Sequence, residues 1–308
     1  MHLLSPLFFI ALLLFKVQAV NIVLSNDDGW AELNIRALFE GLMAANHSVV
    51  VSAPAYDNSG KGSKDKEPTV VKTPDEWHSI EKGFPPIGHN KSHPRLNYVN
   101  SYPATSMKHG IEELAPTFFD GKKPDLAIAG FNVGSNVGIA NRVSGTLGAA
   151  LMADSLGIPA IAFSGVDGTH IPWYTHPWPL YVHLYSEAAV KVVDVLTDNP
   201  QPWMDPGSII SVEFPSLEWQ GTQVCRSVED FKFVLTAEAW TGFRFVWNHG
   251  KDVKTCGHTT LPKEQDAIGK GPCVVAITVL NRSKDNASRD KQATVRENLK
   301  SILTCLED

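Results

Sequence analysis

Two adjacent carboxylates, Asp27 and Asp28, end a short apolar run in the segment NIVLSNDDGW at residues 21–30. Neighbouring like charges repel each other, and a divalent cation can offset that repulsion because Mg²⁺, Mn²⁺ and Ca²⁺ select oxygen ligands. In a loop just beyond a strand, both side chains could turn toward one ion. Taken alone, however, the segment favours an ordinary polar turn with Gly29, in which one carboxylate caps the following helix.

Two other segments carry groups that could complete such a site. The segment GFNVGSNVG at 130–138 sets Asn132 and Asn136 among glycines, which let the backbone approach a ligand closely, and its amides offer neutral oxygens and donors. The segment SGT at 144–146 places hydroxyls and backbone N–H groups at a helix start, which suits phosphate. Alone, each also fits a plain connection or a helix cap. Together they predict a hard cation beside an anion cradle, the pairing needed for metal-assisted hydrolysis of a phosphate ester.

Short apolar strands and amphipathic helices alternate through the first 165 residues. We expect strands at 21–25, 47–54, 123–130 and 158–165, and helices at 31–45 and 144–157. This alternation predicts a doubly wound, Rossmann-like parallel sheet of the α/β class with crossover helices. Such sheets bind ligands at the carboxyl ends of their strands, and every polar segment above follows a strand.

The pattern changes after residue 165. Residues 168–183, rich in Pro, Trp and His, predict an inserted loop, whose Trp173, Tyr174 and Trp178 either pack the loop or stack on a nucleobase. Beyond the loop we expect a helix at 183–196, a strand at 208–215, antiparallel hairpins within 220–279 and a terminal helix at 295–308. The fold prediction is therefore an α/β sheet with a carboxyl-terminal, hairpin-rich antiparallel extension.

The first nineteen residues, MHLLSPLFFIALLLFKVQA, predict a secretory signal peptide cut after Ala19, because the apolar run is too short to span a membrane. No later segment is long and apolar enough to do so, and membrane association is not expected. Sequons for N-glycosylation occur at Asn46, Asn90, Asn281 and Asn286. Together with the leader, they point to a secreted protein.

All four cysteines, Cys225, Cys256, Cys273 and Cys305, lie in the last third of the chain. Their spacing matches no zinc motif, so two disulfides in an oxidising compartment are expected, with three connectivities open. The composition is that of an ordinary globular protein, and the net charge of −6 provides no basic surface for duplex nucleic acid. A G-x-S-x-G element is absent, so a serine hydrolase is not supported.

The segments VLSNDDGW, VVVSAPAYDNSGKGS, NSYPATSMKHG, PDLAIAGFNVGSNVG, VSGTLGAALMA and LGIPAIAFS occur in the order and spacing of the SurE (survival protein E) family. The sequence resembles that family well over about residues 21–165, and its leader, sequons and cysteines suggest a secreted branch. The resemblance implies a metal-dependent acid phosphatase or nucleotidase acting on a small phosphorylated substrate such as a nucleoside monophosphate. It also implies a homo-oligomer, a dimer or tetramer.

The resemblance assigns roles to residues through the matching motifs. The divalent cation (Mg, Mn or Ca) would be held by Asp27, Asp28, Ser59 and Asn132. Phosphate would be bound by Asn26, Asn136, Ser144, Gly145 and Thr146. The nucleophile would be either Asp27 or a metal-activated water. The chain departs from the family pattern at Trp30, at the AELN segment of 31–34 and at Val143, which puts in question the shape of the pocket beside the metal.

We therefore expect a signal peptide at 1–19 and one SurE-like phosphatase domain at 20–308. Residues 20–165 would form the α/β core with the metal site, and residues 166–308 an extension with hairpins, disulfides and a terminal helix. The expected function is metal-dependent hydrolysis of phosphate monoesters. The alternative is a secreted protein of the same fold that binds a metal and an anion without catalysis. A phosphatase that forms an aspartyl-phosphate would need Asp-x-Asp after the first strand, which NDDG lacks.

Overall fold

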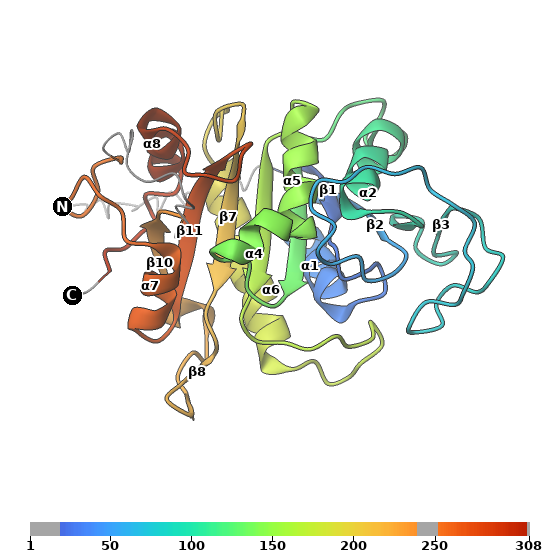
Figure 1. Cartoon of the computed structure of the whole chain (residues 1–308), viewed down its shortest axis with the longest axis horizontal. Coiled ribbons are helices and arrows are strands. Elements are labelled where there is room, and N and C mark those ends of the chain that lie inside the picture. Colours follow the sequence, from blue (N-terminus) through green and yellow to red (C-terminus); the bar gives the residue numbers. More distant parts are fainter. Residues whose placement is uncertain (1–18, 239–251, 307–308) are drawn as a thin grey trace, which may run out of the picture.

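The computed structural model describes residues 19–238 and 252–306 (Figure 1). All of the predicted signal peptide except Ala19 lies outside these residues, and so does the segment FRFVW at 243–247, which belongs to the hairpins predicted within 220–279. Within the described part, no helix combines the length and the hydropathy required to cross a bilayer. The sequon Asn46 is exposed in the turn after the first helix, whereas Asn90, Asn281 and Asn286 are partly buried. Their glycosylation stays a prediction.

A nine-stranded sheet in the order β10-β11-β7-β6-β5-β1-β2-β4-β3 forms the centre of the described structure. All pairings in it are parallel except β3 with β4 and β7 with β11, so the predicted α/β class is confirmed. The strands are β1 (Asn21–Ser25), β2 (Ser48–Pro54), β3 (Ile87–His89), β4 (Leu96–Val99), β5 (Leu126–Val133), β6 (Ala160–Gly165), β7 (Ser208–Phe214), β10 (Lys232–Thr236) and β11 (Val274–Asn281).

Helices cover both faces of this sheet (Figure 1). The helices are α1 (Leu33–Ala44), α2 (Pro103–His109), the π-helix η1 (Gly110–Leu114), α3 (Ala115–Phe118), α4 (Ile139–Val143), α5 (Gly145–Ser155), α6 (Leu180–Thr197), the 3-10 helix η2 (Val228–Asp230), α7 (Glu264–Lys270) and α8 (Arg289–Asn298). The predicted helices at 31–45, 144–157 and 183–196 correspond to α1, α5 and α6.

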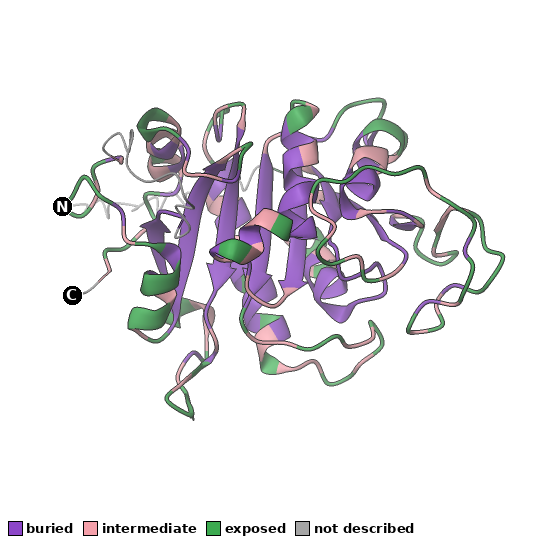
Figure 2. Cartoon of the chain, in the orientation of Figure 1, coloured by how far each residue is buried: buried purple, intermediate pink, exposed green. Residues whose placement is uncertain are grey.

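Alternate residues of β1 belong to two separate apolar cores. Ile22 and Leu24 pack with residues of α1 and α6, whereas Val23 packs with residues of α2 and α5. A strand that alternates between two buried faces reads as a continuous apolar run, as this one does. Figure 2 shows the strands as almost entirely buried.

Strand β1 lies at the point where the order of the sheet reverses. It pairs with β2 on one side and with β5 on the other, and the chain then continues outward from β5 to β6 and β7. In doubly wound sheets the crevice beyond the strand ends at this switch point receives the ligand. The residues that follow β1 and β5 are therefore the ones positioned for chemistry.

The carboxyl-terminal segment differs in part from the prediction. A short antiparallel hairpin does form, from β8 (Glu218–Trp219) and β9 (Thr222–Gln223), but β10 lies parallel to β11 because α7 crosses over between them. The terminal helix is α8, which ends at Asn298 rather than running over 295–308. Beyond it, Thr304 N donates to Phe233 O at 2.7 Å, so the chain leaves the helix to lie along β10.

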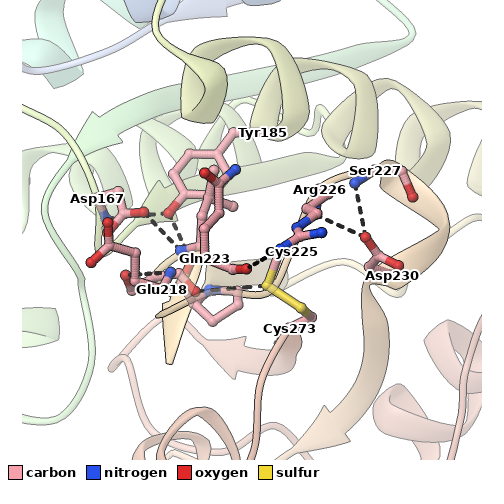
Figure 3. Close-up of a disulfide and its surroundings, with 12 residues drawn as sticks. Asp167, Tyr185, Glu218, Gln223, Cys225, Arg226, Ser227, Asp230 and Cys273 are labelled. Carbon is pink, nitrogen blue, oxygen red and sulfur yellow. Dashed lines mark hydrogen bonds between the residues drawn. A yellow bond between two sulfur atoms is a disulfide. The ribbon is translucent and has the colours of Figure 1, made fainter. Parts of the chain in front are cut away.

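Two disulfides, Cys225–Cys273 and Cys256–Cys305, select one of the three possible connectivities. The first is buried beneath the β8–β9 hairpin, with its cysteines 0% and 5% exposed, and Figure 3 shows it beside the turn in which Asp230 accepts from two backbone N–H groups. The second joins two exposed residues. The prediction of two disulfides is confirmed.

We expect peptide mapping without reductant to recover both pairs. The pairs close loops with sequence separations of 48 and 49, so chain entropy alone gives each about 4 kcal/mol. Because only the first is buried, the double variant Cys225→Ala/Cys273→Ala should lose more unfolding free energy in urea than Cys256→Ala/Cys305→Ala. Recovery of four alkylatable thiols, or equal losses for the two variants, would contradict this account.

Candidate metal and phosphate site

The loop after β1 holds Asn26, Asp27 and Asp28 below the protein surface, with exposures of 0%, 2% and 1%. Asn26 Nδ2 donates to Gly29 O at 2.9 Å, and Asn26 Oδ1 accepts from Gly29 N at 3.3 Å. Gly29 has a φ of +116°, which few other residues adopt. Asn26 therefore uses both polar atoms to shape the turn, and its role in phosphate binding stays a prediction.

Asp27 is anchored to the start of α5. Thr146 Oγ1 donates to Asp27 Oδ1 at 2.6 Å, and Asp27 O accepts from Asn58 N at 2.7 Å. A Cβ on Gly145 would lie 2.8 Å from Asp27 Oδ2, so only glycine allows the helix start to approach this carboxylate so closely. The structure thus brings together Asp27, Gly145 and Thr146, three residues that the sequence assigned to one site.

Asp28 is held from the neighbouring strand. Val133 N donates to Asp28 Oδ2 at 2.9 Å, while Asp28 Oδ1 is buried and has no hydrogen-bond partner among the described residues. The register of β5 against β6 shifts between Ala129 and Asn132, so the strand is irregular just before Val133. Asn132 Nδ2 donates to Val133 O and Gly134 O at 3.2 and 2.6 Å. These bonds fix the amide through its nitrogen, so its oxygen is available to a ligand.

Ionisation of these two carboxyl groups is unfavourable. Burial raises the pKa of Asp27, although the hydrogen bond from Thr146 lowers it in part. Burial and then the charge of Asp27 raise the pKa of Asp28 well above its usual range. A buried carboxylate oxygen without a donor is costly, and a hard cation would satisfy it. The donor set therefore fits a divalent cation at Asp28, with Asn132 able to add a neutral oxygen.

The loop at 56–62, which contains Ser59, closes over the same end of the sheet. Asn58 N binds Asp27 O, and Gly62 N donates to Val143 O at 3.0 Å. Ser59 is exposed, and its N–H donates to Asp57 Oδ1 at 2.7 Å. No three His, Cys, Asp or Glu side chains converge to hold a metal in the described structure. Beyond the two aspartates, a cation here would thus depend on Ser and Asn oxygens and on water, and the ligand role of Ser59 stays a prediction.

The start of α5 has the form that the sequence predicts. Ser144 caps the helix by accepting from Leu147 N at 3.1 Å. Asn136 Nδ2 donates to Ser164 Oγ at 2.8 Å and lies 3.4 Å from Thr146 Oγ1. The amide of Asn136 and the helix start are therefore neighbours, as an anion cradle requires.

Sequence reasoning missed Glu213, a fully buried carboxyl group on β7. Its Oε2 accepts from Asn136 N at 2.9 Å and from Ser135 Oγ at 3.1 Å, so it fixes the loop after β5. Burial raises the pKa of Glu213 to about 8, against the hydrogen bond from Asn136. The signal in the sequence was a lone acidic residue within the apolar strand SIISVEF.

Two residues of the carboxyl-terminal segment also reach the site. Glu264 Oε1 accepts from Gly138 N at 3.1 Å and from Asn141 Nδ2 at 3.0 Å. Lys284 Nζ donates to the carbonyl oxygens of Arg142 and Ser144, each at 3.3 Å. Burial lowers the pKa of Lys284 to about 8, while the charge of Asp27 acts in the opposite direction. A buried amine group therefore lies beside the start of α5.

Two further acidic residues, Asp57 and Glu32, lie near the carboxylate pair. The charge of Asp57 raises the pKa of both Asp27 and Asp28, which places its carboxylate within electrostatic range of the pair. Burial raises the pKa of Glu32 to about 8, and His170 Nδ1 lies 3.0 Å from Glu32 Oε1. The AELN departure from the family pattern thus introduces a buried acid that contacts the inserted loop.

Comparison with known proteins gives a consistent result. Residues 22–232 match the family model described as Survival protein SurE. The chain is 29% identical over 289 residues to a protein named acid phosphatase from Yarrowia lipolytica, covering 86% of this chain and 80% of that one. It is 32% identical over 210 residues to a 5'-nucleotidase SurE from Desulfatibacillum aliphaticivorans, covering 67% and 71%.

The crystal structure of the SurE protein from Aquifex aeolicus has the same fold, with a TM-score of 0.59 at 22% identity, over 90% of this chain and 98% of that one. The family model covers more than half of the sequence, and its matched region contains the carboxylate pair, the β5 loop and the start of α5. This chain is therefore a member of the SurE family.

Proposed function

We propose that this protein hydrolyses phosphate monoesters, with nucleoside monophosphates as a substrate class, at the rim formed by β1, β5 and α5. The observation that carries the proposal is the buried pair Asp27 and Asp28, one of whose oxygens has no partner, directly beside a helix start that suits an anion. The relatives named acid phosphatase and 5'-nucleotidase support the same reaction.

Asp27, Asp28, Asn132 and Ser59 would hold a divalent cation. When bound, such a cation supplies positive charge that neutralises phosphate oxygens and makes water more acidic. Other groups of the protein position the two aspartates. Thr146 keeps Asp27 in place, and Val133 N keeps one oxygen of Asp28 in place.

The substrate phosphate would lie against the start of α5. The free N–H groups of a helix start, together with its dipole, favour an anion. Lys284, which donates to the Ser144 carbonyl oxygen, adds a buried positive charge, and Glu213 accepts from Asn136 N and so holds the loop that presents Asn136. Because the site is buried, water screens these charges less, and their electrostatic interactions with the phosphate would be stronger than at the surface.

We also propose that the protein is secreted after removal of residues 1–19. Two disulfides and the absence of free cysteines among the described residues support an oxidising compartment.

Hydrolysis of 4-nitrophenyl phosphate and of adenosine 5'-monophosphate between pH 4 and 8 tests the proposal. We expect activity that a chelator removes and that Mg²⁺ or Mn²⁺ restores. A folded preparation that remains inert with every divalent cation would instead favour the non-catalytic binding protein.

Asp28→Asn separates catalysis from stability. We expect the rate to fall by roughly 10²-fold or more, the range for loss of one strong electrostatic group. In chelator the variant should be at least as stable as the wild type, because it replaces a buried carboxyl group whose ionisation is unfavourable by a neutral amide whose oxygen can still accept from Val133 N. Rates and melting temperatures provide the two readouts.

Asp125→Asn is the matched control, since Asp125 accepts from Asn21 N at 2.8 Å at the opposite end of β1. Its rate should equal that of the wild type. A near-normal rate for Asp28→Asn, or a loss of its folding, would argue against a ligand role for Asp28.

Glu213→Gln tests the buried carboxyl group behind Asn136. The folded protein keeps the proton of Glu213 up to a pH of about 8, whereas the unfolded chain releases it near 4.5. This contribution to stability is therefore complete below pH 4.5 and is lost as the pH rises toward 8, at about 1.4 kcal/mol per pH unit. Urea unfolding in chelator should show a flatter pH dependence for Glu213→Gln. Parallel pH profiles for the two proteins would contradict this.

A further inference from the structure

A cavity of about 650 Å³ begins two residues beyond Asp28, at Trp30. Its wall also includes Arg36, Phe84, Ile87, Tyr98 and Trp173. The volume lies within the range of small-molecule pockets, which are mostly apolar with a few polar groups. No step of the proposed hydrolysis uses this cavity.

Aromatic rings dominate its wall. Trp30 and Tyr98 are buried, and their ring centroids lie 5.2 Å apart at an angle of 57°. Phe84 and Trp173 remain 42% and 44% exposed, although large aromatic side chains gain from burial. Such a wall offers flat faces on which a planar ring can stack.

The polar groups of the wall that contact Trp30 are hydrogen-bond donors. The Arg36 guanidinium carbon lies 4.9 Å from the centre of the Trp30 ring, and Arg36 Nε donates to Trp30 O at 2.8 Å. The two terminal nitrogens of Arg36 have no acceptor in the described structure, and the buried Trp30 Nε1 has none either. A ligand with acceptor atoms on its ring would complement these groups.

Trp173 in the wall of this cavity comes from the inserted loop at 168–183. Trp173 N donates to Ala31 O, and Leu33 N donates to Ile171 O, both at 3.0 Å. Glu32 Oε2 accepts from Ile171 N at 3.3 Å. The loop is thus bonded to the chain just after the Asp28 turn, so Trp173 has a fixed position relative to the carboxylate pair. Tyr174, its neighbour, is 54% exposed and is not part of the wall.

We propose that this cavity binds the leaving group of the phosphate ester and selects a planar aromatic ring that carries hydrogen-bond acceptors, as a purine does. The Cα atoms of Asp28 and Trp30 are at most about 7 Å apart, because two residues of chain join them. A phosphate held at the carboxylate pair therefore leaves its ester group within reach of the cavity. This inference rests on the proposed phosphatase function, and it assigns Trp173 a role in specificity.

The variants Trp173→Ala and Phe84→Ala test the proposal, since both side chains are partly exposed and their removal spares the core. For adenosine 5'-monophosphate, kcat/KM should fall roughly five- to a hundredfold, the range for loss of one base–aromatic stack, mainly through KM. For 2-glycerol phosphate, which has no ring, kcat/KM should remain within about twofold. The control Tyr174→Ala should leave both substrates unaffected.

Binding of adenosine, which has no phosphate, separates this proposal from the proposed function. Calorimetry should show that the wild type binds adenosine and that Trp173→Ala binds it more weakly by the same factor. Adenosine binding without hydrolysis of any ester would support the cavity as a binding site for the ring and refute the proposed phosphatase function. Hydrolysis of both esters with no adenosine binding, or equal losses for both substrates in Trp173→Ala, would overturn the assignment of the cavity.

Discussion

The burial of two adjacent carboxylates is the constraint on which the rest of this structure depends. Burial raises the pKa of both carboxyl groups, the charge of Asp27 raises that of Asp28 further, and one oxygen of Asp28 has no donor among the described residues. Such an arrangement is stable when a charge of opposite sign offsets it or when one carboxyl group keeps its proton. The fold places the pair at the switch point of the sheet, just beyond the end of β1, which pairs with β2 on one side and β5 on the other, and this is where doubly wound sheets receive a ligand.

Segments far apart in the sequence hold the pair in place. The start of α5 supplies Thr146, β5 supplies Val133 N, and the loop at 56–62 supplies Asn58 N. The carboxyl-terminal segment acts one step further out, since Glu213, Glu264 and Lys284 bind the loop after β5 and the start of α5, where we propose that phosphate binds. The NDDG motif is therefore supported by residues that lie outside it, and buried polar networks of this kind fix one geometry.

The sequence was sufficient to predict the sheet, its main helices and the cap of α5, because apolar strands and helix caps are local signals. Ser144 caps α5 as predicted, and Asp27 meets Gly145 and Thr146. It was not sufficient for Glu213 and Lys284, since a single charged residue in a strand or turn becomes informative only when tertiary structure shows what it contacts. The parallel pairing of β10 was missed for the same reason: pairing direction depends on the crossover through α7, and not on the strand itself.

Titration calorimetry of the chelator-treated protein with Mn²⁺ tests whether a divalent cation binds at Asp27 and Asp28. The account predicts one ion bound per chain, with protons released on binding in amounts that differ between buffers of different ionisation enthalpy, because the raised pKa of Asp28 leaves protons for the ion to displace. Asp28→Asn should abolish the binding, and Asp125→Asn should preserve it. Absence of Mn²⁺ and Mg²⁺ binding to the folded wild type, or equal binding by Asp28→Asn, would contradict the account.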